Sequence, residues 1–436
     1  MSVPRPLLVF SHALLIVAAW IAAIDAVAQL DFNRDPINYD TMTTTDAIGT
    51  LQAKIESGEA TLEWDEQHGW LPALLENLDV KRSSQTLVFS KTSQQLQRIS
   101  PRRPRALYFS DEVYVGWVQD GDFVELSAVD PKQGAIFYTA AQERTRKPEI
   151  RRDKGQCIVC HGSSKTAGVP GYLVRSVFAG ADGHPLFRLG TTTTDHRTPL
   201  SDRYGGWYVT GTHGDMRHRG NAIASERESP PIDGEAGANL AELTRHCQIE
   251  SYLEPTSDLT ALMVLEHQTT MHNLITRASY IARQTTHQQQ AMNEALNRPR
   301  DFLSESALRR IHNAAEELLK YMLFCDEFQL TSPVAGTSEF AAEFQRRGPR
   351  DSQGRSLRDF DLTHRMFKHP CSFLIYSESY ESLPDIVLGH LERRLVEVLE
   401  GVDHSTNFSH LSPADRKAIR EIVMETKPCL LRGSSL

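Results

Sequence analysis

The sequence has few cysteines, no excess of positive charge and no long apolar run after its first 28 residues. Its 436 residues include six cysteines, too few for the disulfide framework of a small secreted fold. The formal net charge of -9 argues against a protein dedicated to nucleic acid, because such proteins need a basic surface for the phosphates. Hydrophobic residues make up 40% of the chain, which is enough for folded cores and excludes wholesale disorder.

The first 28 residues have the pattern of a secretory signal peptide. Arg5 precedes an apolar run over residues 7–24, and the sequence Ala-Val-Ala at 26–28 offers small residues for cleavage. An uncleaved membrane anchor is the alternative, because the run is close to the length that spans a bilayer. We favour cleavage because Asp25 and the small residues follow the run. The sequence therefore predicts a protein exported to the periplasm or elsewhere in a bacterial cell envelope, with a membrane contact only if the segment stays uncleaved.

The rest of the chain changes from short strands to long helices. Apolar alternation with turn signals such as Asp120-Gly121 predicts a strand-rich region, and apolar residues at helical spacing predict helices beyond residue 240. We therefore expect an α+β fold with a strand-rich N-terminal half and an α-helical C-terminal domain. The expected strands are Thr86–Phe89, Ala106–Phe109, Val113–Val118, Phe123–Val129, Ala135–Thr139, Leu173–Phe178 and Trp207–Thr210, and the expected helices cover 44–80, 259–290, 303–328, 386–400 and 413–425.

Five units are predicted along the chain. A polar stretch with Pro230 and Pro231 is interpreted as a linker between the two halves. The units are a signal peptide (1–28), an α+β N-terminal domain (29–142), a region around a paired-cysteine motif (143–224), the linker (225–239) and a helical C-terminal domain (240–436).

The paired cysteines belong to the sequence Cys157-Ile158-Val159-Cys160-His161. Cys-x-x-Cys-His is the attachment signature of haem c. Two thiols three residues apart lie on one turn of backbone, so each can reach one vinyl group of the same porphyrin. The following imidazole then reaches the iron as an axial ligand. The motif predicts one covalently attached haem c, with Cys157 and Cys160 as thioether sites and His161 as the proximal iron ligand.

Three other uses of the two thiols are weaker. A structural zinc site takes four Cys or His ligands, and the chain has no second Cys-x-x-Cys. A redox-active dithiol suits a βαβ context, whereas predicted hairpins surround this motif. A disulfide between cysteines this close in sequence is strained.

On these five residues the sequence resembles the c-type cytochromes. The resemblance implies electron transfer to or from a redox partner protein or a small-molecule electron donor or acceptor. The surrounding sequence, with Asp195-His196-Arg197 and the glycine-rich residues 205–214, looks like large single-haem exported proteins of environmental bacteria. A haem enzyme such as a peroxidase, or a haem-based redox or gas sensor, is the alternative.

Several residues are candidates for the ligand on the other side of the iron. His213 stands between Gly211 and Gly214, where the backbone can approach a porphyrin closely. We take His213 as the preferred second iron ligand, beside an open position. The alternatives are Met216, His218, His196 and His272.

Two further features bear on the site. Residues 81–110 contain seven basic residues and no acidic one, including Arg98, Arg103 and Arg105. This stretch either pairs haem propionates, docks an acidic partner or is a solvated loop.

The cysteines outside the motif are expected to form one or two disulfides in an exported protein, with the pairing open. They are Cys247, Cys325, Cys371 and Cys429.

Overall fold

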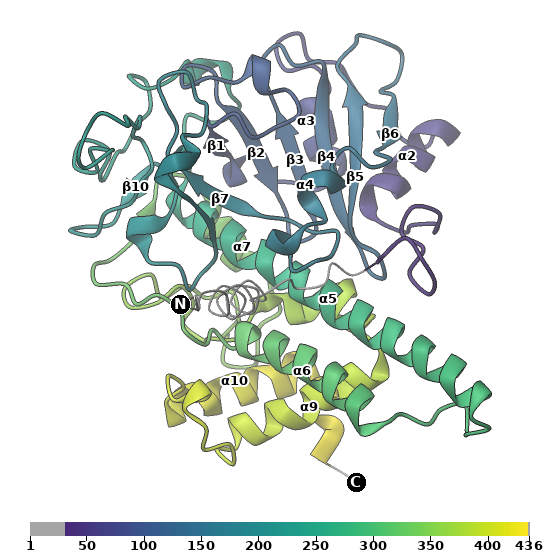
Figure 1. Ribbon diagram of the computed structural model, residues 1–436. Helices are drawn as coiled ribbons and strands as arrows, with labels where there is room; N and C mark the ends of the chain where they lie inside the picture. Colours follow the sequence, from purple (N-terminus) through teal and green to yellow (C-terminus); the bar gives the residue numbers. More distant parts are fainter. Residues whose placement is uncertain (1–30, 435–436) are drawn as a thin grey trace, which may run out of the picture.

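The computed structural model describes residues 31–434, so the signal peptide expected over Met1–Ala28 lies outside the described residues. A large antiparallel sheet occupies the N-terminal half and helices follow it, which confirms the predicted α+β fold (Figure 1). Within 31–434, no helix is long and apolar enough to cross a bilayer.

Seven strands form the main sheet, in the order β6-β5-β4-β3-β2-β1-β9. All neighbouring pairs are antiparallel, and β2 to β6 form a meander of sequential neighbours. Two small sheets pair β7 with β8 and β10 with β11. The strands are β1 Thr86–Val88, β2 Arg105–Phe109, β3 Val113–Trp117, β4 Phe123–Asp130, β5 Gly134–Ala141, β6 Ile150–Arg152, β7 Val174–Val177, β8 Thr191–Thr194, β9 Trp207–Tyr208, β10 Gly211–Thr212 and β11 Ala335–Gly336.

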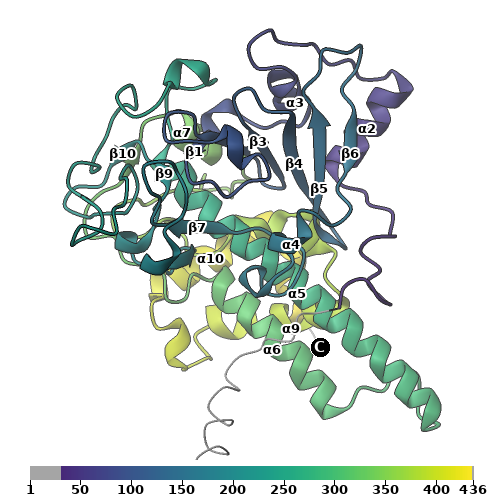
Figure 2. The ribbon, with the colours of Figure 1, turned by 45° about the horizontal axis from the view of Figure 1, so that its top comes forward.

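The two faces of the main sheet have different partners. Successive side chains of a strand point to opposite faces, so Leu126 and its neighbour across the ladder, Tyr138, share one face. That face packs against α2 (Ala47–Ser57) and α3 (Leu71–Asn77) in a single apolar core. Phe137 lies on the opposite face, which looks toward the long helix α5. Figure 2 shows α2 and α3 on one side of the sheet and α5 on the other.

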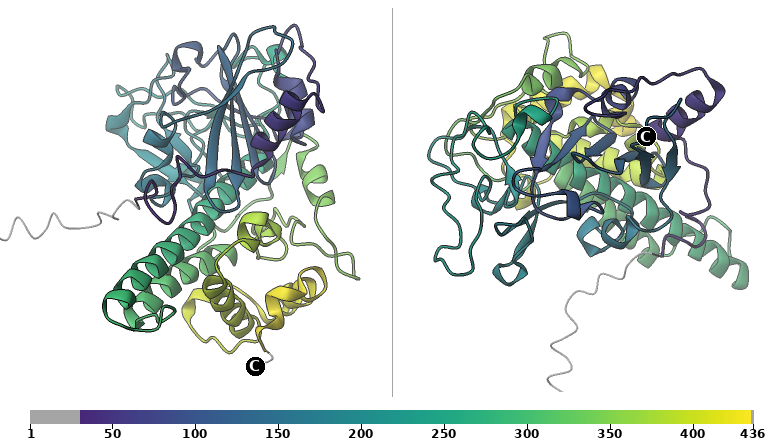
Figure 3. Two further views of the ribbon diagram at one scale, coloured as in Figure 1. Left: turned by 90° about the vertical axis from the view of Figure 1, so that its right-hand side faces the viewer. Right: turned by 90° about the horizontal axis from the view of Figure 1, so that it is seen from above.

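The helix α5 (Leu259–Ala295) connects the two halves of the molecule. Its 37 residues begin at the cap Asp258, whose carboxylate accepts a hydrogen bond from the backbone N–H of Ala261. Trp207 of the sheet and residues of α5, α6 and α9 belong to one buried cluster. The helix therefore runs between the sheet and the C-terminal helices (Figures 1 and 3). The other helices are α4 Ile158–His161, α6 Glu305–Met322, α7 Phe340–Arg346, α8 Glu378–Glu381, α9 Asp385–Leu399 and α10 Pro413–Thr426.

The structure contains the predicted strands and helices, but their ends are shifted. Residues 44–80 hold two short helices, because Gly58 adopts a left-handed conformation (φ 80°) and ends α2. The expected linker, 225–239, hydrogen-bonds to the strand-rich half: Asn221 donates to the carbonyl of Gly237, and the N–H of His213 donates to the side chain of Asn239. The division into five units stays a prediction.

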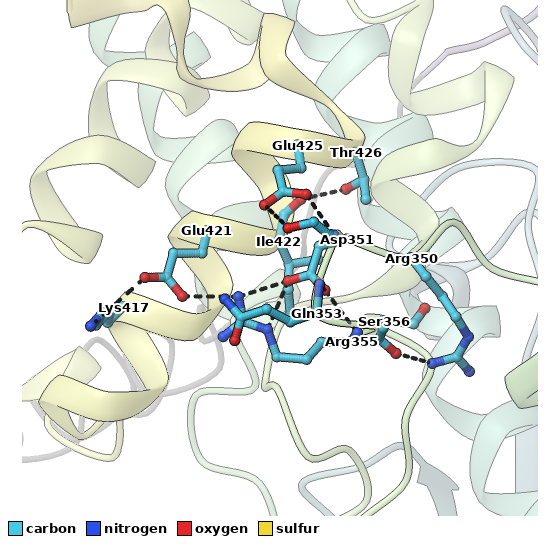
Figure 4. A network of polar contacts seen from close by, with 12 residues as sticks. Arg350, Asp351, Gln353, Arg355, Ser356, Lys417, Glu421, Ile422, Glu425 and Thr426 are labelled. Carbon is cyan, nitrogen blue, oxygen red and sulfur yellow. Dashed lines mark hydrogen bonds and ion pairs between the residues drawn. The ribbon is translucent and has the colours of Figure 1, made fainter.

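The C-terminal half also contains a loop held by charge. Asp351 accepts hydrogen bonds from the backbone of Gln353 and Arg355, and its ion pair with the Arg355 guanidinium measures 2.7 Å. Arg355 also contacts Glu421 of α10 at 2.9 Å (Figure 4). These contacts fix the loop on α10, whose first turn is closed by a capping box between Ser412 and Asp415.

A buried ion pair ties the segment before β9 to α5. Arg203 Nη1 lies 3.0 Å from Glu266 Oε2, and the two side chains are 4% and 0% exposed. The hydroxyl of Tyr204 donates to the same carboxylate at 3.1 Å, and Arg203 also donates to the carbonyl of His196. Removing one charge of such a pair leaves the other buried without compensation.

We expect Arg203→Met to lower the free energy of unfolding by about 3–5 kcal/mol. The double variant Arg203→Met/Glu266→Met removes both charges and is expected to recover most of that loss. Equilibrium urea unfolding of the three proteins measures the difference. A double variant as unstable as Arg203→Met would contradict this account of the pair.

Candidate functional site: the turn Cys157 to His161

The predicted haem motif forms one helical turn, α4, on the face of the sheet that carries Phe137. Asp153 begins the turn, because its Oδ2 accepts hydrogen bonds from the backbone N–H groups of Gly155 (3.0 Å) and Cys157 (2.9 Å). The N–H groups of Cys160 and His161 both donate to the carbonyl of Cys157, at 3.2 and 2.9 Å. The structure thus brings the two thiols onto a single turn, as attachment to one porphyrin requires. Cys157 is half-buried and Cys160 is exposed.

The imidazole of His161 is oriented by a backbone carbonyl. Its Nδ1 lies 2.9 Å from the carbonyl oxygen of Gly171, which can only accept, so the proton is on Nδ1. The N–H of Gly171 in turn donates to the carbonyl of His161 at 2.8 Å. Burial lowers the pKa of His161 and favours the neutral ring. The lone pair of Nε2 is left for a metal, which is the arrangement found when a histidine ligand donates its other N–H to a carbonyl.

Aromatic rings back the imidazole on the side of the sheet. The ring of Phe137 on β5 lies 4.9 Å from that of His161, centroid to centroid, and Tyr172 lies 6.1 Å from Phe137. The ring of Tyr172 also lies 4.2 Å from that of Tyr114 on β3, with the ring planes tilted by 34°. Ile158 and Cys157 pack against this group. The turn is therefore seated on an apolar surface on one side and is open on the side of Cys160.

A charged pair lies on the same face of the sheet. Ser127 of β4 is opposite Phe137 of β5, and Glu125, two residues before Ser127, lies on the same face. Glu125 is opposite Gly116 of β3, and the register between β3 and β2 places Arg105 on this face as well. Arg105 Nη1 is 3.1 Å from Glu125, and the pair is close enough to influence the pKa of His161. The Nε of Arg105 is buried and has no hydrogen-bond partner among the described residues. It is a donor that a carboxylate group bound at this site would satisfy.

The Cys157 thiol is held in its neutral form. Burial, and then the nearby Asp153, raise its pKa to about 12. A redox-active dithiol requires a lowered thiol pKa, which this environment does not provide. Thioether formation to a vinyl group, in contrast, ends with an uncharged sulfur.

The structure does not bring His213 to His161. His213 follows β10, is fully buried, and its Nε2 accepts a hydrogen bond from the N–H of Asn239 at 3.1 Å. In the strand order, β9, which precedes β10 in the chain, is five strand spacings from β5, where Phe137 contacts His161. These two strands are therefore on the order of 20 Å apart. Figures 1 and 2 both show β10 beyond the β1 end of the sheet, whereas α4 lies beside β4 and β5. A shared iron between His161 and His213 does not fit this arrangement.

The other candidates for the second ligand are buried and engaged elsewhere. Only His272 is connected to His161 by the ring contacts of residues 31–434, and Tyr172 and Phe137 stand between the two. The remaining contacts are His196 Nδ1 to His267 Nδ1 (2.9 Å), Gly220 N–H to His218 Nδ1 (3.0 Å), His272 Nε2 to the carbonyl of Asp111 (2.7 Å), and Met216 in the core that contains α5.

Several basic residues of the stretch 81–110 form ion pairs with acidic residues. Arg98 pairs with Asp122 and Arg103 with Asp120, both at 3.1 Å in the β3–β4 turn, and Arg105 pairs with Glu125. Acidic residues distant in sequence thus pair with three of its seven basic residues. The four cysteines outside the motif are free thiols: Cys247, Cys325 and Cys371 are buried and Cys429 is exposed. The expected disulfides are absent from the described residues.

Gly171 is a site residue whose role the sequence did not reveal. A Cβ atom at this position would lie 2.1 Å from Oδ1 of Asn273 and 3.3 Å from the side chain of Thr166. Its signal in the sequence is the turn-forming run Gly168-Val169-Pro170-Gly171 shortly after the motif. That run does not say which carbonyl would face the imidazole.

We expect Gly171→Ala to destabilise the fold by about 1–3 kcal/mol, because the added methyl group must displace the Asn273 side chain. Gly180→Ala is the matched control, since its Cβ would have no neighbour closer than 3.6 Å. Urea unfolding of both variants measures the difference. Equal stability of the two variants would contradict the close packing inferred around Gly171.

Burial makes the stability depend on pH through His218. Its pKa falls to about 3 in the fold, against about 6.5 in an unfolded chain. Because the unfolded chain then binds the proton and the folded protein does not, the stability due to neutral His218 is complete above pH 6.5 and is lost as the pH falls toward 3. We expect the stability deficit of His218→Asn to shrink by about 1 kcal/mol between pH 6.5 and 5.5. Urea unfolding at both pH values tests this, and a constant deficit would refute it.

The chain matches no protein-family model, and neither a curated protein nor a solved structure is significantly similar to it. Its function is therefore inferred from the chemistry of residues 153–172.

Proposed function

We propose that the protein is an exported c-type cytochrome that carries one haem c on Cys157 and Cys160 and transfers electrons in the periplasm. The observation that carries the proposal is the hydrogen bond from His161 Nδ1 to the carbonyl of Gly171. It leaves Nε2 as a lone-pair donor on the same helical turn as the two thiols. This local geometry supports the roles that the sequence motif suggests for Cys157, Cys160 and His161.

The residues of the site have separate tasks in this proposal. The haem supplies an iron that alternates between the ferrous and ferric states. Cys157 and Cys160 anchor the porphyrin covalently, and His161 ligates the iron. Phe137 limits rotation of the imidazole through its ring contact at 4.9 Å. Arg105, with its unpaired buried Nε, offers a hydrogen bond to a haem propionate.

Electron exchange requires the porphyrin edge to be near the surface. Cys160 is exposed, and the apolar Val159 between the two cysteines is 78% exposed. An exposed apolar residue beside the attachment sites suits brief contact with a redox partner protein or a small-molecule electron carrier. Transfer at this edge needs no opening of the fold.

A haem enzyme or a haem-based sensor is the second candidate. It is favoured by one observation: the five proposed second ligands (His196, His213, Met216, His218 and His272) are all buried and make other contacts within 31–434. An iron position open to peroxide or a small gas follows from that arrangement.

Absorption spectroscopy tests the proposal on the full chain matured in a host with haem-attachment machinery. We expect a Soret band that survives denaturation in acid and urea, because the porphyrin is covalently bound. Cys157→Ser/Cys160→Ser is expected to lose it. Cys429→Ser is the matched control, since it also removes an exposed thiol but lies outside the motif.

The spectrum also separates the two candidates. A low-spin ferric spectrum with rapid reduction by small electron donors supports electron transfer. A high-spin spectrum favours the open iron position, and turnover of peroxide then separates the enzyme from the sensor. The absence of any Soret band in the wild-type protein would refute the whole proposal.

A further inference from the structure

Asn273 is a buried side chain on α5 that hydrogen-bonds to the backbone of Tyr172, close to His161. It is 4% exposed. Its Oδ1 accepts a hydrogen bond from the backbone N–H of Tyr172 at 2.8 Å, and its Nδ2 donates to the carbonyl of Tyr172 at 2.6 Å. One side chain thus satisfies both backbone groups of a residue 101 positions away in sequence. A buried backbone segment held at both groups has little freedom to shift.

Tyr172, which Asn273 holds, directly follows Gly171, whose carbonyl orients the imidazole of His161. Gly171, the neighbour of Tyr172, makes two bonds with His161: its carbonyl accepts from Nδ1 and its N–H donates to the backbone carbonyl. Gly171 also lies so close to Asn273 that a Cβ would be 2.1 Å from Oδ1. The connection therefore runs from α5 through Asn273, Tyr172 and Gly171 to His161 without a gap.

We propose that Asn273 is a positioning residue for the haem ligand, setting the strength and direction of the His161–Gly171 hydrogen bond from the long helix α5. The inference rests on the proposed cytochrome function. A carbonyl held firmly against Nδ1–H increases electron donation from the imidazole to the metal. Stronger donation stabilises the ferric state of a bound haem. The two hydrogen bonds from Asn273 to Tyr172 therefore lower the reduction potential and strengthen ligation by His161.

The test replaces Asn273 by leucine, which has a similar volume but no hydrogen-bonding groups. The substitution removes both bonds to Tyr172 and leaves the His161–Gly171 hydrogen bond without this support. Loss of such an outer hydrogen bond to a metal-ligating histidine weakens ligation by about 10–100-fold. Since one proton competes with the iron for Nε2, the pH at which acid displaces His161 from ferric haem is expected to rise by about one to two units. The reduction potential is expected to become more positive. Spectroscopic acid titration and spectroelectrochemistry measure the two shifts.

A second measurement does not depend on haem. In the full chain with Cys157→Ser/Cys160→Ser, the backbone amide of Tyr172 should be protected from hydrogen exchange by Asn273. Adding Asn273→Leu is expected to accelerate exchange in the peptide containing Tyr172 by about tenfold. If the wild-type protein carries no haem, the proposed function is refuted. The exchange measurement then still tests whether Asn273 holds the backbone of Tyr172.

Gln284→Leu is the matched control. Gln284 is also a buried amide on α5, and its Nε2 donates to the carbonyl of Asp31 at 2.8 Å, away from Gly171 and Tyr172. It is expected to change neither the acid midpoint nor the potential. Asn273→Ala provides a second variant if the leucine protein does not fold. An acid midpoint equal to that of the wild type in a folded Asn273 variant, or an equal shift in Gln284→Leu, would overturn the proposal.

Discussion

The carbonyl group of Gly171 is the constraint on which the site depends. It receives the proton of His161 Nδ1 at 2.9 Å, and so it decides which imidazole nitrogen remains for a metal. A local turn of four residues has too few internal hydrogen bonds to hold a ring in place by itself. The orientation of His161 therefore comes from outside α4, from a segment that the chain brings back to it ten residues later.

The asymmetry of the sheet explains why α4 lies where it does. One face is covered by α2, α3 and further apolar residues of the same core, and residues such as Leu126 and Ile136 are nearly inaccessible. The opposite face has an apolar part around Phe137 and a polar part with Arg105 and Glu125. A flat porphyrin with an apolar body and two carboxylates needs both kinds of surface next to each other. The face that carries α4 offers both.

The sequence predicted the features that depend on neighbouring residues. The strands followed from alternation and turn signals, the start of α5 from the cap Asp258, and the thiol–imidazole turn from a five-residue motif. It could not predict pairings across long separations. The neighbouring glycines favour His213 as an iron ligand, but this residue follows β10, which lies beyond the β1 end of the sheet. The basic residues of 81–110 likewise find acidic partners in a turn that sequence proximity does not indicate.

The size of the helical half has a physical reason if α5 supports the iron ligand. A loop that carried its own second hydrogen-bonding group would move with the ligand it is meant to fix. Asn273 belongs instead to a helix of 37 residues, packed against the sheet on one side and against α6 and α9 on the other. Groups on such packed elements hold their positions more accurately than groups on loops. The helices beyond α5 contribute to the site by keeping α5 from shifting, although none of them touches His161 within the described residues.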